Sequence, residues 1–532
     1  MYQCNLPAPP TMATNAPLLV NHPNEEMATD VDRYEEMTNA LWSPPNDVRT
    51  NLVSPGGTTV RSSSSKRHEK QGTISSSVFN LCNTVLGSGT LAMGYACKRL
   101  GVIGFVLAMV FLALLADYAI EVLFLSVKKW KVQRARYPSM GRKTMGSFGE
   151  NVSSWVVTVQ QFGACIGYTV IIGDVLQPIA ALSGLEWTCE RWPLQLGLLS
   201  CVIFPLLLLP SMDSLKYVSF ISLVLIWSAV IAIAVNGFLV VADPYRREEL
   251  MHPRIHTSTS VCNVSSSDAR HYNHSTITTP SSSSSSSSSY SIGHMNMFPN
   301  SFGDALAALP IISFAFLCHQ NTFPIYNELK NASPKRMATV GHYSITICCL
   351  VYILSGIMGY YTFLSDTQSD LLRNFKVENT YFSLPMDIVR TGFGISCVLS
   401  FPLMVWEARH NLDVLLFGNR PYQFWRNFGL NFLILSLCGS IGMSVKNLDV
   451  VLGFIGSTCS PIMIFCLPAL FYLVPQKKRL TCKNFRSIFL FLWGLLLIPC
   501  CLTMWSMENF VCIKDNENGS ALPSICNVFG IH

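Results

Sequence analysis

Long apolar stretches separated by short polar segments run along the chain from residue 75 to residue 507. Each is close in length to the roughly 20 apolar residues that an α-helix needs to cross a bilayer. The eleven stretches are 75–97, 101–127, 152–179, 194–211, 216–242, 302–325, 338–364, 382–405, 427–445, 450–474 and 486–507. This pattern predicts an all-α polytopic membrane protein with a transmembrane region over residues 74–507.

Polar and small residues interrupt the first stretch. Asn83 is followed by Gly87, Ser88 and Gly89, and an intact helix that faces lipid gains nothing from them. A broken membrane helix is tolerated where its freed backbone groups are buried in protein or line a cavity. One interpretation is therefore a helix break that forms a ligand site near the middle of the membrane. The alternative is a small-residue patch for close helix packing, and this stretch alone does not separate the two.

Basic residues mark one side of the membrane. They cluster in the loops after stretches two, six, eight and ten, and these loops share a side if the amino terminus is inside and eleven spans are crossed. The residues are Lys128, Lys129, Lys131, Arg134, Arg136, Arg142, Lys143, Lys330, Lys335, Arg336, Arg409, Arg420, Arg426, Lys477, Lys478, Arg479 and Lys483. The positive-inside rule thus supports the count independently. Residues 1–73 are polar and rich in Pro and Ser, so we expect a disordered cytoplasmic tail and no cleavable signal peptide.

The opposite side carries glycosylation sequons and cysteines. Segment 243–300 is a serine-rich loop with sequons at Asn263 and Asn273, and the tail 508–532 has one at Asn518. We expect glycans at all three, and hence both segments outside the cytoplasm. Four cysteines on this side suggest two disulfides in an oxidising compartment, although spacing alone does not prove the pairing. The pairs are Cys512 with Cys526 and Cys189 with Cys262.

The number of spans suggests an internal repeat. If the first ten spans are two repeats of five, the odd number forces the second repeat to be inserted upside down, a recurring transporter architecture. Stretch six is then the counterpart of stretch one, and it too is unusual. Pro310 interrupts its start and the polar residues His319, Gln320 and Asn321 end it. Each feature is also compatible with an ordinary helix end.

Several motifs in this order resemble the amino acid/auxin permease superfamily, and specifically its sodium-coupled neutral amino-acid transporter branch. The resemblance covers residues 75–507 approximately, and it excludes the amino-terminal tail and the serine-rich loop. The matching stretches are 79–83 (FNLCN), 87–89 (GSG), 167–174 (GYTVIIGD), 313–321 (SFAFLCHQN), 359–363 (GYYTF), 370–375 (DLLRNF) and 399–402 (LSFP).

The resemblance implies a LeuT-like fold of 5+5 inverted repeats with an eleventh helix appended. It also implies that backbone groups of Gly87, Ser88 and Gly89 bind the substrate carboxylate, which suits the free N–H groups of a helix amino terminus. Sodium ligands implied by the resemblance are Asn83 and Ser400, whose oxygens suit a hard cation.

Two further residues of stretch six, Ser313 and Phe314, are expected to line the substrate site. For Phe314, simple packing is the alternative. Thr90 and Gly94 depart from the residues usual in the superfamily, so the identity of the amino acid does not follow from the resemblance.

Ionisable residues inside the spans have two interpretations each, because membrane carboxylates are costly and often functional. Asp117 and Glu121 either carry protons, or they reach the interface or pair with a loop lysine. His319 either serves as a proton-sensitive gate or is a solvated cap at the cytoplasmic helix end. Asp387 and Arg390 are expected to form an ion pair. No chemistry is assigned to Asp174.

Composition excludes other classes of function. Half of the residues are hydrophobic and 13% are charged, well below the roughly 25% charge of a soluble domain. The net charge of +6 is explained by the basic loops and requires no nucleic acid. We see no phosphate-binding loop, no Ser–His–Asp arrangement and no zinc-type spacing. We therefore expect neither an enzyme nor an ATP-driven pump, and no cofactor or metal beyond Na+ as coupling ion.

The sequence as a whole predicts a monomeric secondary active transporter of small neutral amino acids, coupled to sodium, in the plasma membrane or an endomembrane. Two alternatives remain open. One is proton-coupled or uncoupled amino-acid transport in an intracellular membrane. The other is an amino-acid-sensing receptor that transports little and signals through its amino-terminal tail.

Overall fold

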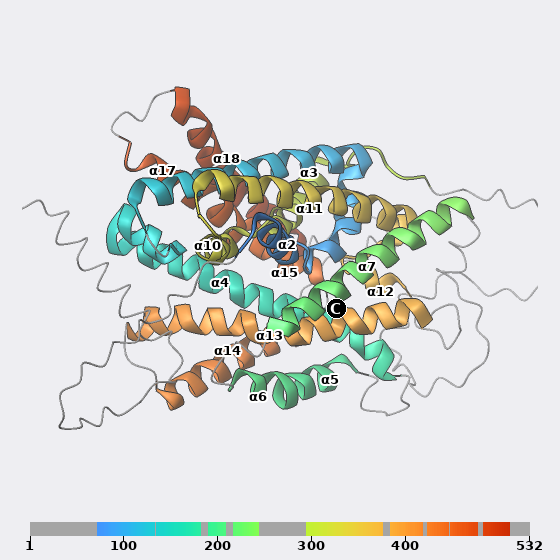
Figure 1. Ribbon diagram of the computed structural model, residues 1–532. Coiled ribbons are helices and arrows are strands. Elements are labelled where there is room, and N and C mark those ends of the chain that lie inside the picture. Colours follow the sequence, from blue (N-terminus) through green and yellow to red (C-terminus); the bar gives the residue numbers. More distant parts are fainter. Residues whose placement is uncertain are drawn as a thin grey trace, which may run out of the picture. The chain divides into compact units, whose positions relative to one another are not determined.

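The computed structural model describes residues 72–132, 135–181, 190–208, 216–243, 294–375, 384–418, 423–445, 447–476 and 482–510. Regular structure within these ranges is helical, apart from a parallel bridge between Gly72 and Leu329 (Figure 1). Three parts of the predicted segments lie outside the described residues: 1–71 of the tail 1–73, 244–293 of the loop 243–300 and 511–532 of the tail 508–532.

The helices follow the predicted apolar stretches. They are α2 (Ile74–Val85), α3 (Gly89–Trp130), α4 (Tyr137–Ala181), α5 (Arg191–Leu198), α6 (Phe204–Leu207), α7 (Lys216–Ala242), α9 (Phe302–Ala315), α10 (His319–Glu328), α11 (Pro334–Phe363), α12 (Leu371–Asn374), α13 (Leu384–Phe417), α14 (Phe424–Ser444), α15 (Leu448–Ser457), α16 (Cys459–Pro461), α17 (Leu467–Leu473) and α18 (Cys482–Phe510). Short π-helical turns, Leu199–Ile203 and Ile462–Cys466, join α5 to α6 and α16 to α17.

Nine helical segments in the described residues, two of which combine shorter helices, are long and apolar enough to cross a membrane, as expected of a polytopic membrane protein. Two features account for the difference from eleven predicted spans. The first stretch is divided between α2, which has 12 residues, and the beginning of α3, which is joined across a kink at Gly101 to the helix of the second stretch. The apolar segment Arg191–Leu207 is shorter than a full span. The eleven-span count stays a prediction.

A glycine in the left-handed region separates the two parts of α3. Gly101 has φ 68° and ψ 164°, and a Cβ atom there would lie 2.5 Å from the backbone nitrogen of Phe298. The residues that follow Gly101 pair with the segment before α9, since Val102 N–H donates to Asn296 O at 2.9 Å. Only glycine combines this φ with so close an approach, so the helix is kinked between the predicted first and second spans.

Capping residues set the start of three helices. Thr73, Ser301 and Ser333 precede α2, α9 and α11, and each side chain accepts a hydrogen bond from the backbone N–H three residues later. Hydroxyl caps satisfy donors that the first turn leaves free. Pro334 opens α11, a position where its missing N–H costs nothing.

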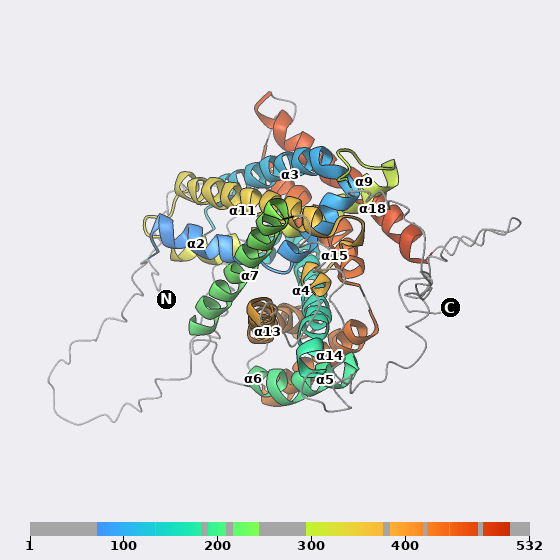
Figure 2. The ribbon, with the colours of Figure 1, turned by 90° about the vertical axis from the view of Figure 1, so that its right-hand side faces the viewer.

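The segments of the first and sixth stretches pack mainly against α3, α11 and α15. Helix α11 packs along α3, and α13 packs along α4 and α7 (Figure 1). The view in Figure 2 looks along several of these helices, with α15 between α4 and α18. In the most apolar part of Leu448–Leu473, 83% of residues are buried, against 28% in Asn484–Glu508. The tenth stretch is therefore central, and α18 lies at the periphery.

Candidate functional site

The first predicted break is present. Helix α2 ends at Val85 and α3 begins at Gly89, with Leu86 outside helical geometry at φ −76° and ψ 70°. In the link, Leu86 N–H donates to Cys82 O and Gly87 N–H donates to Val85 O, both at 2.8 Å. Within the described chain, the backbone N–H groups of Ser88 and Gly89 have no hydrogen-bond acceptor. These two donors stand at the positive end of the α3 dipole.

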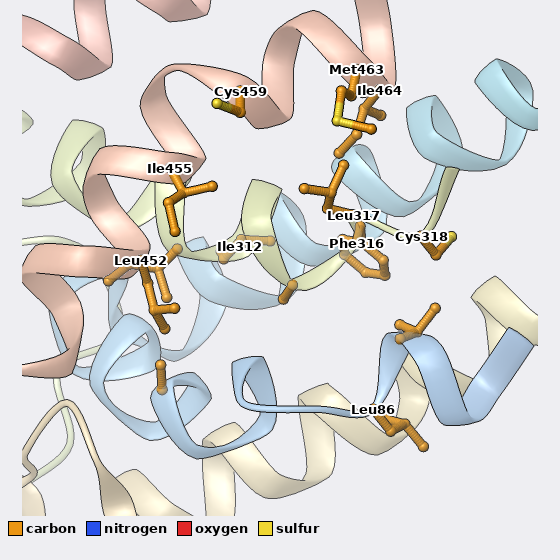
Figure 3. Packing of buried hydrophobic residues seen from close by; sticks show 14 of the residues in the cluster. Leu86, Ile312, Phe316, Leu317, Cys318, Leu452, Ile455, Cys459, Met463 and Ile464 are labelled. Atoms are coloured by element: carbon orange, nitrogen blue, oxygen red, sulfur yellow. The ribbon is translucent and has the colours of Figure 1, made fainter. Parts of the chain in front are cut away.

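The sixth stretch is also broken. Helix α9 ends at Ala315 and α10 begins at His319, so Phe316, Leu317 and Cys318 form a link. Figure 3 shows these three residues on the link, with Leu86 at the end of α2 and Ile455, Cys459 and Met463 on the tenth stretch. The link follows Pro310, which lies inside α9. The interpretation of stretch six as an ordinary helix end is wrong.

The two breaks lie against each other. A Cβ atom at Gly89 would be 3.0 Å from Ala315 Cβ, so the start of α3 meets the end of α9. The hydroxyl of Tyr352, in the middle of α11, lies 2.5 Å from Val85 O and 3.2 Å from Ala315 O. Tyr352 is not among the residues predicted from the sequence, because an aromatic residue in an apolar helix carries no signal of such a role.

Space and unpaired polar atoms are found beside these breaks. A Cβ atom at Gly87 would meet no atom within 4 Å. Ser313 is only 2% exposed, and its hydroxyl has no hydrogen-bond partner in the described part of the chain. Buried polar groups are normally paired, so this hydroxyl is available to a ligand. Phe314 is half-buried and packs against the apolar core.

The two predicted sodium ligands occupy different helices. Asn83 lies in the last turn of α2, half-buried, and its amide makes no hydrogen bond to any described residue. Ser400 lies in α13, where its Oγ donates to Ser222 Oγ of α7 at 3.3 Å. No hydrogen bond joins Asn83 to Ser400 in the described residues.

The comparison with protein families decides the class of this molecule. A family model described as transmembrane amino acid transporter protein matches residues 70–508. The chain belongs to this family. The resemblance to the amino acid/auxin permease superfamily is therefore confirmed over most of the sequence, and both helix breaks fall inside the matched region.

Individual relatives of this family member carry a narrower name. Sodium-coupled neutral amino acid transporter 4 of Pongo abelii is 28% identical over 444 residues, which are 77% of this chain and 79% of the relative. The protein of that name from Homo sapiens is 28% identical over 440 residues, with the same coverage. The Rattus norvegicus protein is 28% identical over 451 residues, or 80% of this chain and 82% of the relative.

A polar chain in this family member leads from the second break to a carboxylate. Gln320, at the start of α10, donates its amide N–H to Gln161 Oε1 of α4 at 3.3 Å. The Gln161 amide in turn donates to Glu407 of α13. Glu407 is not among the predicted site residues because it follows the predicted end of stretch eight, while α13 continues to Phe417.

His319 differs from its expected surroundings. Its side chain is fully buried, and Nε2 lies 3.2 Å from the carbonyl oxygen of Ala116. The interpretation as a solvated cap is wrong, because the residue starts a second half-helix inside the protein rather than ending a span.

The ion pairs of the spans are partly as predicted. Arg390 and Asp387 approach to 3.8 Å, which confirms the expected pair. Asp117 pairs with His342 of α11 at 2.5 Å rather than with a loop lysine, which is one of the alternatives for it. Asp174 contacts Arg191 at 3.0 Å.

A second charged cluster joins three helices next to a small pocket that Arg99 and Glu508 line. Arg99 of α3 contacts Asp304 of α9 at 3.3 Å and Glu508 of α18 at 2.5 Å. Residues Tyr95 and Asp449 also line this pocket.

The predicted glycosylation and disulfide residues lie outside the described residues. They are Asn263, Asn273, Asn518, Cys189, Cys262, Cys512 and Cys526.

Proposed function

We propose that this protein is a secondary active transporter of small neutral amino acids, driven by sodium through alternating access. The observation that carries the proposal is the pair of unpartnered N–H groups of Ser88 and Gly89 at the first break. Two adjacent donors at a helix amino terminus match the two oxygens of an amino-acid carboxylate. The open space at Gly87 and the free Ser313 hydroxyl provide room and a further polar contact.

The charge of the two links favours a neutral side chain. Neither Leu86–Gly87–Ser88 nor Phe316–Leu317–Cys318 contains Asp, Glu, Lys or Arg. A charged substrate side chain taken out of water at this position would lack a counter-charge, which is costly. The names of the relatives, sodium-coupled neutral amino acid transporter, support the same choice.

Sodium is proposed to bind between Asn83 and Ser400 and to order the break that receives the amino acid. The Asn83 amide oxygen makes no hydrogen bond in the described chain, and amide and hydroxyl oxygens suit a hard cation. Sodium and the amino acid both bind more tightly to the state in which this break is ordered. This shared preference is their coupling free energy, so each ligand raises the affinity for the other by the same factor. A tenfold sodium gradient contributes about 1.4 kcal/mol, and a potential of about 100 mV adds roughly 2.3 kcal/mol per charge.

The architecture proposed for this mechanism is LeuT-like, with two inverted five-helix repeats and α18 as the appended helix. Breaks in the first and sixth stretches, which are the first spans of the two repeats, support it. We further propose a cytoplasmic amino terminus, an extracytoplasmic carboxy terminus with glycans at Asn263, Asn273 and Asn518, and a monomer in the plasma membrane or an endomembrane.

Proton coupling is the second candidate, and Glu407 is the observation that favours it. The chain Gln320–Gln161–Glu407 links α10, next to the second break, to a titratable carboxylate on α13. A proton that binds Glu407 would act on the second break, which lies against the first break where the substrate carboxylate is proposed to bind.

Uptake in proteoliposomes tests the proposal. We expect radiolabelled L-alanine to accumulate only with an inward sodium gradient, and L-lysine and L-glutamate not to accumulate. L-alanine uptake that follows a proton gradient in sodium-free buffer, and that Glu407→Gln abolishes, would replace sodium by proton coupling. L-alanine binding without flux under any gradient would contradict transport and favour a sensor.

A further inference from the structure

Tyr352 joins the two helix breaks through one hydroxyl. It is fully buried in α11, and this hydroxyl reaches the last carbonyl of α2 at 2.5 Å and the last carbonyl of α9 at 3.2 Å. Both carbonyls belong to helix carboxyl ends, which carry the negative end of the helix dipole. The hydroxyl has one proton, which the two carbonyls share, and a shared donor between two such ends offsets their mutual repulsion.

The surroundings of Tyr352 fix the position of its ring. The ring contacts Phe316 of the second link edge to face, with centroids 5.7 Å apart and planes at 77°. Gly89 stands beside the hydroxyl, since a Cβ atom there would lie 3.6 Å from it. Tyr352 therefore touches both breaks by its hydroxyl and the second link also by its ring (Figure 3 shows Phe316 on that link).

The Ala315 carbonyl depends on this contact more than the Val85 carbonyl does. Val85 O also accepts the Gly87 N–H at 2.8 Å. Ala315 O has no other donor in the described residues, because the backbone N–H groups after it bond to Ile312, Phe314 and Phe316. Without the hydroxyl, a buried carbonyl at the end of α9 would be unsatisfied.

We propose that Tyr352 is a positioning residue that sets the separation of the two breaks and so the geometry of the amino-acid site between them. The proposal rests on the proposed transport function for the role of that site. One hydroxyl holds the two links in position whether or not the protein is a transporter.

Tyr352→Phe removes the hydroxyl and keeps the ring. The matched control is Tyr360→Phe, two turns further along α11, where the hydroxyl accepts a hydrogen bond from Asn296 N–H at 3.0 Å and touches neither break. In proteoliposomes with a sodium gradient, we expect the KM for L-alanine to rise about tenfold in Tyr352→Phe, equivalent to about 1.4 kcal/mol. We expect kcat per reconstituted transporter to stay within about twofold, and Tyr360→Phe to match the wild type. A KM that is equal in both variants would overturn the proposal, since a merely structural defect lowers the number of active transporters and leaves KM unchanged.

Hydrogen exchange gives a reading that needs no transport. We expect peptides that contain residues 86–89 and 316–318 to exchange about tenfold faster in Tyr352→Phe and at the wild-type rate in Tyr360→Phe. Faster exchange in a protein that transports no L-alanine would leave the role of Tyr352 standing and refute the transport function. Unchanged exchange in a protein with sodium-driven uptake would overturn the role of Tyr352 and leave the transport function standing.

If Tyr352→Phe does not fold, 3-fluorotyrosine at position 352 replaces it as the probe. Fluorine makes the phenol a stronger donor, so exchange of both links is then expected to slow. Exchange at the wild-type rate would overturn the proposal.

Discussion

Gly456 of α15 lies against the backbone of Pro310 in α9, so closely that a Cβ atom at Gly456 would be 1.9 Å from the Pro310 carbonyl oxygen. Backbone cannot move aside as a flexible side chain does, and overpacking of a core already costs about 1–3 kcal/mol where side chains yield. We expect Gly456→Ala to lower the melting temperature of the detergent-solubilised protein strongly or to abolish its recovery.

The control for Gly456 is Gly429→Ala in α14, where an added Cβ would meet no atom within 4 Å. Alanine favours a helix over glycine by roughly 1 kcal/mol, so this variant should melt at the wild-type temperature or slightly above it. Equal melting temperatures for the two variants would contradict the close approach of α15 to α9.

Gly87 and Gly89 are expected to respond differently to alanine. Gly87→Ala adds a methyl group to open space, whereas at Gly89 the new Cβ meets Ala315 Cβ at 3.0 Å. We expect Gly87→Ala to melt like the wild type and to lose L-alanine uptake, because its methyl group occupies the proposed substrate space. Gly89→Ala should lower both stability and uptake. Normal uptake by a folded Gly87→Ala would place the amino acid elsewhere.

The sodium site is tested by removing one oxygen at a time. Asn83→Ala and Ser400→Ala should each raise the sodium concentration for half-maximal uptake, by roughly tenfold if a ligand contact is worth about 1.4 kcal/mol. Ser222→Ala is the control, since it removes the hydrogen-bond partner of Ser400 and no proposed ligand. Unchanged sodium dependence in Asn83→Ala and Ser400→Ala at normal protein levels would refute this site.

Asp370 gives the folded protein a pH dependence. It lies between the predicted seventh and eighth spans, is 1% exposed, and caps α12 through Leu372 N–H at 3.0 Å. Burial and the charge of Asp174 raise the pKa of Asp370 to about 7, against the opposing charges of Arg373 and Arg390. The unfolded carboxyl ionises near 3.8, so between these values the folded state binds more protons. Stability from this group is full below pH 3.8 and is lost as pH rises to about 7, with a slope of up to about 1.4 kcal/mol per unit.

Melting temperatures between pH 5 and pH 8 measure this effect. We expect the wild type to lose stability as pH rises to about 7, and Asp370→Asn, which keeps a capping oxygen, to lose much of that slope. Asp366→Asn changes an exposed carboxyl of the same loop and should keep the wild-type profile. If the melting temperature of Asp370→Asn falls with pH as steeply as that of the wild type, the pH dependence belongs to other groups.

The sequence predicts the first break well because its signal is local. Glycine, serine and asparagine close together inside an apolar stretch disfavour an unbroken helix that faces lipid, and α2 ends two residues before Gly87. The second break needs the repeat argument, since Phe316–Leu317–Cys318 is an ordinary apolar run. One interpretation of the neighbouring His319 is a solvated helix end. It is wrong because the sequence does not show that a further helix, α10, begins at this residue.

Contacts between distant stretches are beyond such reasoning. Tyr352 meets Val85 across 267 residues of sequence and Ala315 across 37, and nothing in a run of apolar residues specifies which neighbour a phenol meets. The pairing of Asp117 with His342 is unpredictable for the same reason, because it depends on how α3 and α11 align.

The bridge between Gly72 and Leu329 has a mechanical consequence. Gly72 N–H donates to Glu328 O at 3.2 Å, and Lys330 N–H donates to Gly72 O at 2.9 Å. Both ends of helix α2 are therefore held by hydrogen bonds. Its carboxyl end is bonded to Tyr352, which also contacts Ala315 before the second break. Its amino end is bonded through Gly72 to the end of α10 and the residues that follow it. For α2 to tilt, the hydrogen bonds at one end must break while those at the other end persist. The end whose hydrogen bonds break first therefore determines the direction in which α2 moves.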